Sequence, residues 1–289
     1  MQLWRRPFRF PSMKRILIFL SLVLPSLAAF AQDSSSKYIE LADSADNYIR
    51  RERWEQAERV ILEALRLEPG NFTNALLLSN LGVVQTNLGK PQEALESYRL
   101  GISIAPSVAA LYTNRARTLM TIGNYKDALV DLDKTLEIDS VQKWPLKMRG
   151  LLKLSGGDLD GAKSDFMHLQ KIDPKNPAVF QGLGRVAQME GKDDEALAYY
   201  DEALAIEDDA ETLFSRILLK INMLKYSEAS EDIRLGIKSF PENPDFYLAR
   251  GYLHRLHYRN DEAEIDKKIA LDKGADPQFV EQLIPKIGK

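Results

Sequence analysis

The chain has 289 residues, carries 39 lysines and arginines against 42 aspartates and glutamates, and contains no cysteine. The missing cysteine excludes disulfides, thiolate metal sites and cysteine catalysis. Hydrophobic residues make up 45% of the chain, which argues against wholesale disorder, and the length allows either two ordinary domains or one long array of repeats.

The N-terminal segment, residues 1–31, has the composition of a secretory signal peptide. Five basic residues precede an apolar run from Ile16 to Leu24, and Ala29 and Ala31 give the small-residue pattern of a signal-peptidase site. Cleavage there would leave Gln32 as the mature N-terminus. A retained membrane anchor is the alternative, although the apolar run is shorter than the about 20 residues that span a bilayer.

Residues 32–36 form a polar spacer, and Met13 is an alternative start of translation. Because the N-terminal segment carries five basic side chains and no acidic one, the rest of the chain has a net charge of −8. This negative net charge disfavours nucleic acid and anionic membrane surfaces as partners. We expect an exported protein, in the periplasm or, alternatively, secreted.

After the spacer, one alanine recurs at a nearly constant step of about 34 residues, a period typical of helical repeats. The members of this series are Ala57, Ala94, Ala128, Ala162, Ala196, Ala229 and Ala263. Glycines lie five residues before four of them, at positions 89, 123, 157 and 191. Such a period indicates one helical unit stacked on copies of itself, because a single unit is too small to bury its own apolar face.

The third unit illustrates the predicted hairpin. Leu111, Ala116 and Leu119 follow the apolar spacing of one helical face, Gly123 breaks that helix, and residues 125–138 form a second one. A small residue at the crossing allows the two helices to approach closely, which explains why alanine recurs.

This pattern resembles the tetratricopeptide repeat (TPR) family. The residues that carry the resemblance in the second unit are Leu81, Gly82, Gln85, Ala94, Tyr98, Gly101 and Pro106, and those in the fifth are Leu183, Gly184, Ala187, Ala196, Tyr200 and Ala203. In the last unit Lys267 occupies an aromatic position of the family pattern.

The resemblance covers residues 37–275 and implies an all-α fold, a right-handed α-solenoid of about seven helix-turn-helix hairpins. The units are expected near 38–71, 75–108, 109–142, 143–176, 177–209, 210–243 and 244–275. A capping helix and tail are predicted over 276–289, since a stacked array needs a polar outer face.

Four of the seven units carry an arginine thirteen residues before the repeat alanine and an aspartate three residues after it. The two positions lie nearly level in an antiparallel hairpin. We therefore predict four structural ion pairs within units: Arg115 with Asp131, Arg149 with Asp165, Arg216 with Asp232 and Arg250 with Asp266.

The resemblance further implies that the first helix of each unit lines a concave groove that binds extended or helical peptides. The groove residues expected from the period are Thr113, Arg117, Trp144, Lys147, Leu151, Gln181, Arg185, Phe214, Leu218, Leu248 and Tyr252. The cations Arg117, Lys147 and Arg185 favour a partner with an acidic segment or a free carboxylate beside apolar residues. An ordinary solvated face is the alternative interpretation.

Catalytic motifs are not found in the sequence. His254 and His257 have a spacing compatible with the edge of a metal site, but no further His or Cys stands nearby, so we interpret them as exposed helical histidines and expect no metal or cofactor. We predict a non-catalytic protein-interaction module or assembly scaffold of the cell envelope. A carrier or sensor subunit for a small ligand or glycan is the alternative.

Overall fold

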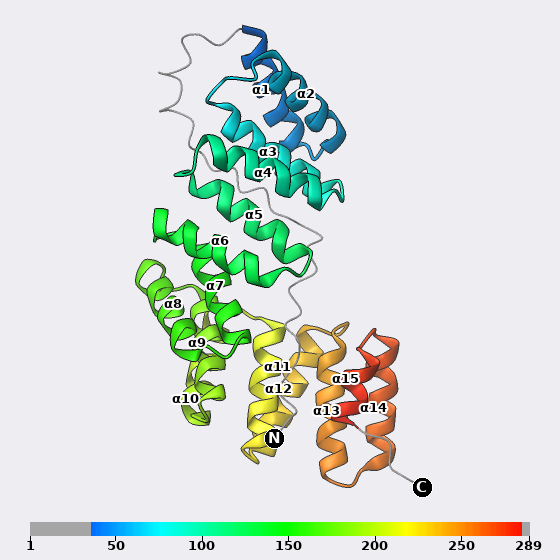
Figure 1. The fold of residues 1–289 in the computed structure, drawn as a ribbon. Helices are drawn as coiled ribbons and strands as arrows, with labels where there is room; N and C mark the ends of the chain where they lie inside the picture. Colours follow the sequence, from blue (N-terminus) through cyan, green and yellow to red (C-terminus); the bar gives the residue numbers. More distant parts are fainter. Residues whose placement is uncertain (1–35, 285–289) are drawn as a thin grey trace. The chain divides into compact units, whose positions relative to one another are not determined.

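The computed structural model describes residues 36–284, and within them every regular element is an α-helix (Figure 1). The all-α prediction is therefore confirmed. The predicted signal peptide, most of the polar spacer and the last five residues lie outside the described residues. The helices are α1 (Ser36–Arg50), α2 (Trp54–Leu67), α3 (Asn74–Asn87), α4 (Pro91–Ile104), α5 (Ala109–Thr121), α6 (Tyr125–Ile138), α7 (Lys143–Ser155), α8 (Leu159–Ile172), α9 (Pro177–Met189), α10 (Asp193–Ile206), α11 (Ala210–Asn222), α12 (Tyr226–Ser239), α13 (Pro244–Leu256), α14 (Asn260–Asp272) and α15 (Pro277–Leu283).

Consecutive helices form hairpins, namely α1 with α2, α3 with α4, α5 with α6, α9 with α10, α11 with α12 and α13 with α14, and α15 follows the last of them. The described chain divides into two compact units, residues 36–152 and 153–284, with the division inside α7. None of the described helices combines the length and the apolar character that crossing a membrane requires.

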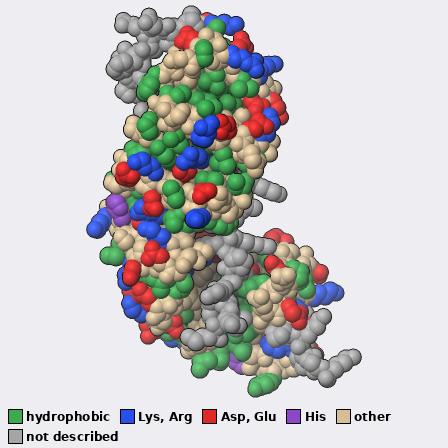
Figure 2. Space-filling model, in the orientation of Figure 1, with side chains coloured by type: hydrophobic (Ala, Val, Ile, Leu, Met, Phe, Trp, Pro, Cys, Tyr) green, Lys and Arg blue, Asp and Glu red, His purple; other side chains and the backbone are tan. Residues whose placement is uncertain are grey.

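The repeat alanines form the centre of each hairpin. All seven are fully buried, and the small methyl side chain lets the two helices of a hairpin approach closely. On the face shown in Figure 2, acidic and basic side chains are interspersed among the hydrophobic ones.

The turns between paired helices explain the glycine period. Gly89, Gly123, Gly157 and Gly191 have φ between 74° and 85°, a left-handed conformation that glycine adopts without strain. The same turn position in the first, sixth and seventh hairpins is occupied by Glu52, Leu224 and Tyr258, with φ of 55°, 61° and 59°. Hairpin geometry therefore imposes this conformation even where a side chain makes it unfavourable by about 1–2 kcal/mol.

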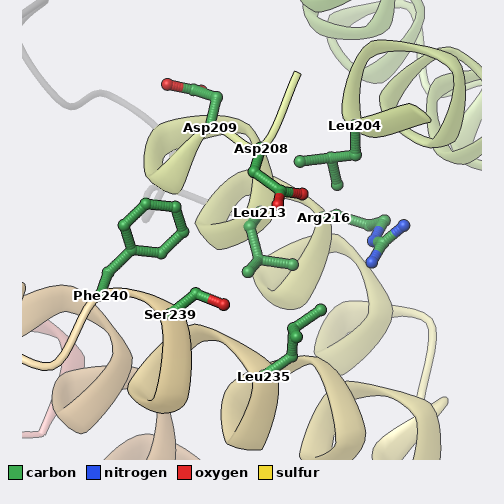
Figure 3. Close-up of a pocket in the computed structure, with 8 residues that line it drawn as sticks. All are labelled: Leu204, Asp208, Asp209, Leu213, Arg216, Leu235, Ser239 and Phe240. Carbon is green, nitrogen blue, oxygen red and sulfur yellow. The ribbon is translucent and has the colours of Figure 1, made fainter. Parts of the chain in front are cut away.

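Packing between α10, α11 and α12 leaves a small cavity of about 40 Å³ (Figure 3). Leu204, Leu213, Leu235 and Phe240 supply its apolar wall, and Asp208 and Arg216 are among its polar neighbours. A space of this size holds about one water molecule and is far below the several hundred Å³ of a typical ligand pocket. This cavity gives no support to the small-ligand or glycan alternative.

Candidate functional site

Three of the predicted arginine–aspartate pairs are present in the structure as two-pronged hydrogen-bonded ion pairs. Arg115 donates from Nε and Nη2 to the two carboxylate oxygens of Asp131, at 2.8 and 2.6 Å. Arg216 binds Asp232 at 2.9 and 2.9 Å, and Arg250 binds Asp266 at 2.9 and 2.6 Å. Every one of these aspartates is buried, so the pairs hold the two helices of a hairpin together in the core.

The fourth predicted pair, Arg149 with Asp165, joins residues of different compact units and stays a prediction. Within its own unit, Arg149 donates from Nη1 to Asp133 at 2.8 Å. In the other unit, the Lys153 ammonium lies 3.0 Å from Asp165.

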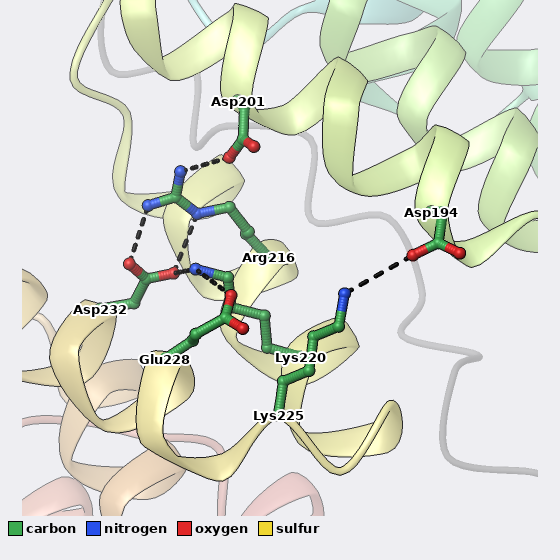
Figure 4. A network of polar contacts seen from close by, with 7 residues as sticks. All are labelled: Asp194, Asp201, Arg216, Lys220, Lys225, Glu228 and Asp232. Atoms are coloured by element: carbon green, nitrogen blue, oxygen red, sulfur yellow. Dashed lines mark hydrogen bonds and ion pairs between the residues drawn. The ribbon is translucent and has the colours of Figure 1, made fainter.

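The pair in the sixth hairpin belongs to a larger network that the repeat comparison missed (Figure 4). Arg216 also donates to Asp201 of α10 at 2.6 Å, and Lys220 donates to Asp232 at 2.8 Å. The position of Lys220, four residues after Arg216 on the same helix, is a signal that could have identified it. The contact with Asp201 links successive hairpins, which a search within units does not detect.

Two predicted groove residues of the 153–284 unit are in its core, which corrects their assignment as side chains available to a partner. Phe214 is 3% exposed and Leu248 is fully buried. Leu248 shares a buried cluster with Val280 and Leu283 of α15. The C-terminal helix therefore covers part of the face that the sequence assigned to peptide binding.

The other predicted groove residues of this unit differ in their contacts. Arg185 of α9 forms an ion pair with Glu211 of α11, and Gln181 donates to Asp209 at 3.3 Å. The guanidinium of Arg185 is thus already paired, which weakens its predicted role as a free cation for an acidic partner. Leu218 and Tyr252 are half-buried.

In the 36–152 unit, the guanidinium of Arg117 lies over the face of the Trp144 indole, 3.6 Å from the ring centroid. Both side chains are half-buried, and Lys147 follows Trp144 by one turn of α7. Leu151 is half-buried as well, whereas Thr113 is buried and donates to the Ala109 carbonyl at 3.1 Å. Thr113 therefore belongs to the core, contrary to its assignment as a groove residue.

Arg117 differs from the other half-buried arginines among residues 36–284, all of which have a carboxylate partner. No acidic side chain of the described chain pairs with Arg117 or with Lys147. Burial lowers the pKa of Arg117 to about 10, against a weaker opposing effect of Tyr98, so the group is still protonated at neutral pH. Arg117 is a partly desolvated positive charge without a counter-ion in the described chain.

This arrangement suits the recognition of a carboxylate. The guanidinium of Arg117 lies over the Trp144 ring, and no carboxylate of the described residues pairs with it. A guanidinium can donate two parallel hydrogen bonds, the geometry that a carboxylate accepts. Lys147, one turn after Trp144 on α7, adds a second cation without a carboxylate partner among the described residues. Arg117, Trp144 and Lys147 are therefore named the carboxylate site.

One of the two histidines departs from its prediction. His257 is exposed, but His254 is half-buried, with Nε2 3.8 Å from Asp266, and burial lowers the pKa of His254. Within the described residues, no three histidine, aspartate or glutamate side chains are grouped as metal ligands would be.

Comparison with known proteins agrees with the helical hairpins. Three sequence models of the tetratricopeptide repeat match residues 43–109, 108–138 and 179–213. The chain is 28% identical over 167 residues to a TPR repeat-containing protein of Pseudomonas aeruginosa, covering 56% of the chain and 28% of that relative. It is 32% identical over 95 residues to the Hsp70-Hsp90 organizing protein of Triticum aestivum, covering 33% of the chain and 16% of that relative.

A solved tetratricopeptide repeat protein from Parabacteroides merdae has the same fold, with a TM-score of 0.71 and 26% sequence identity over 86% of this chain and 98% of that one. The stacked hairpins define a helical repeat protein. This chain belongs to the tetratricopeptide repeat family, whose members are generally non-catalytic protein-binding modules. It spans less than a third of the length of the two curated relatives named above.

Proposed function

We propose that this protein is an interaction scaffold that captures an acidic peptide or protein segment at the carboxylate site. The observation that carries the proposal is Arg117, the half-buried arginine that has no carboxylate partner within the described chain. Burying a charge without a partner is unfavourable, so a fold rarely keeps one where it has no use. A carboxylate from a partner would supply the missing counter-ion.

The overall charge supports the same partner. The protein is acidic, so an acidic segment is repelled by most of its surface and attracted where Arg117 and Lys147 stand unpaired. Trp144 and Leu151 add half-buried apolar surface beside these cations, which favours an acidic residue next to an aromatic or aliphatic one. The wheat relative is named as an organizer of two proteins, in keeping with a role in bringing proteins together.

Changing Arg117 to glutamine is expected to weaken the capture of labelled peptides that contain an Asp-Glu pair by about tenfold or more, because a hydrogen bond to a charged group contributes about 1.5–3 kcal/mol. Fluorescence anisotropy on the full chain measures this. Arg185→Gln is the matched control, since Glu211 already pairs with Arg185, and should bind like the parent chain. Equal affinity of Arg117→Gln and the parent would exclude the site, as would equal binding of peptides with Asn-Gln in place of Asp-Glu.

We also propose that the protein is exported to the cell envelope, most simply to the periplasm. The basic residues, apolar run and Ala29/Ala31 pattern of the N-terminal segment support this address. Cell fractionation followed by N-terminal sequencing is expected to recover an envelope species that begins at Gln32. A chain recovered from the cytoplasm with this segment intact would contradict export.

A further inference from the structure

The C-terminal helix reaches further across the 153–284 unit than its place in the chain requires. In a stacked array each hairpin contacts only its neighbours, so a helix after α14 should pack on α13 and α14 alone. Phe279 of α15 instead meets Phe214 of α11 edge to face, with ring centroids 6.5 Å apart and planes at 68°. Leu218 and Tyr252 pack against the same buried cluster as Phe279.

The residues beneath α15 occupy the repeat positions of the carboxylate site. Phe214 and Leu248 stand fifteen residues before their repeat alanines, as Lys147 does, and Leu218 stands eleven residues before, as Arg117 does. In the 153–284 unit these positions are apolar or aromatic, and a segment of the chain itself covers them.

A buried lysine secures the far end of α15. Lys267 of α14, which replaces the aromatic residue of the family pattern, donates from Nζ to Glu281 at 2.8 Å and to the Ile284 carbonyl at 2.9 Å. The side chain is 8% exposed, so these two bonds form largely out of water. A cation at the C-terminal end of a helix also interacts favourably with the helix dipole.

The attachment of α15 depends on a small number of side chains. The helix has seven residues, too few to be stable by itself in water. It is joined to α14 by a short turn at Gly274, whose φ is 87°. Its docking depends on the side chains of Phe279, Val280, Leu283 and the following Ile284 and on the contacts made by Lys267.

We propose that α11 and α13 form a second binding site, which α15 occupies as an internal ligand and which accepts a short helix of the same chemistry from a partner. That helix carries an aromatic residue in its first turn, apolar residues one and four positions later, and a carboxylate that reaches Lys267. This second site rests on the proposed function, because it occupies the repeat positions that form the carboxylate site in the 36–152 unit. In the 153–284 unit these positions bind a mainly apolar helix. Partner binding then requires α15 to leave.

The test uses the full chain and a fluorescent peptide of residues 274–289. Glu281→Gln in the chain weakens the hold on α15 while leaving Lys267 in place for Glu281 of the peptide, and is expected to raise the affinity for this peptide by about tenfold or more relative to the parent chain. Glu242→Gln is the matched control, because Glu242 pairs with Lys273 and not with α15, and this variant should bind like the parent. The peptide with Phe279→Ala should fail to bind, and Arg117→Gln in the chain should change nothing, which separates this site from the carboxylate site.

Hydrogen exchange on the unmodified chain gives a second measurement that does not depend on a variant folding. Amides of α15 are expected to exchange through an opening that leaves α13 and α14 protected. Exchange of α15 only together with its neighbours would show a permanent cap and overturn the proposal. Equal peptide affinity of the Glu281→Gln and Glu242→Gln chains would overturn it as well.

Discussion

Replacing Arg115 by methionine is expected to lower the free energy of unfolding by about 3–5 kcal/mol. Asp131 is 2% exposed and accepts two hydrogen bonds from Arg115, so the substitution leaves a carboxylate buried without its counter-ion. Urea denaturation followed by circular dichroism measures the loss, which should appear as a lower midpoint.

Arg117→Met is the matched control, two residues further along α5. The contact with Trp144 contributes about 0.5–2 kcal/mol, but the methionine also removes a charge that is half-buried without a carboxylate. These effects oppose each other, and we expect a change within about 1 kcal/mol. If the two variants were equally destabilised, the ion pair with Asp131 would not be the reason for the loss.

Replacing Phe246 by alanine is expected to lower the free energy of unfolding by about 3–5 kcal/mol, the usual range for a large aromatic side chain in a core. Phe246 is fully buried, stacks on Phe240 with ring centroids 5.8 Å apart, and fills the space above Gly236. Denaturation of the full chain measures the loss in the hairpins that contain α12 and α13.

The glycine beneath this ring provides an independent check. In an exposed helix Gly→Ala is stabilising by about 1 kcal/mol, but a Cβ on Gly236 would stand 2.2 Å from Cδ1 of Phe246. Gly236→Ala should therefore destabilise the parent chain and should be tolerated better when Phe246 is leucine. A stabilising effect of Gly236→Ala in the parent would contradict the close packing on which both expectations depend.

The sequence was most informative where a contact repeats within one hairpin. Each of the three observed arginine–aspartate pairs joins residues sixteen apart, so helical spacing and the turn determine the geometry before any other part of the chain is considered. The buried alanines follow from the same reasoning. The sequence predicted the left-handed turn only where glycine occupies it. Glu52, Leu224 and Tyr258 adopt the same conformation, but their residue types do not favour it.

Contacts between hairpins could not be predicted in this way. The repeat period assigned Phe214, Leu248 and Arg185 to one open face, whereas two of them lie in the core and the third is paired with Glu211. The sequence by itself determined the helices, their pairing into hairpins and the bonds inside them, since these depend on neighbours at constant separation. Only the tertiary structure decided which cations remain unpaired and where α15 lies. Both depend on contacts between side chains of different hairpins, and the repeat period specifies neither which residues these are nor how far apart they lie.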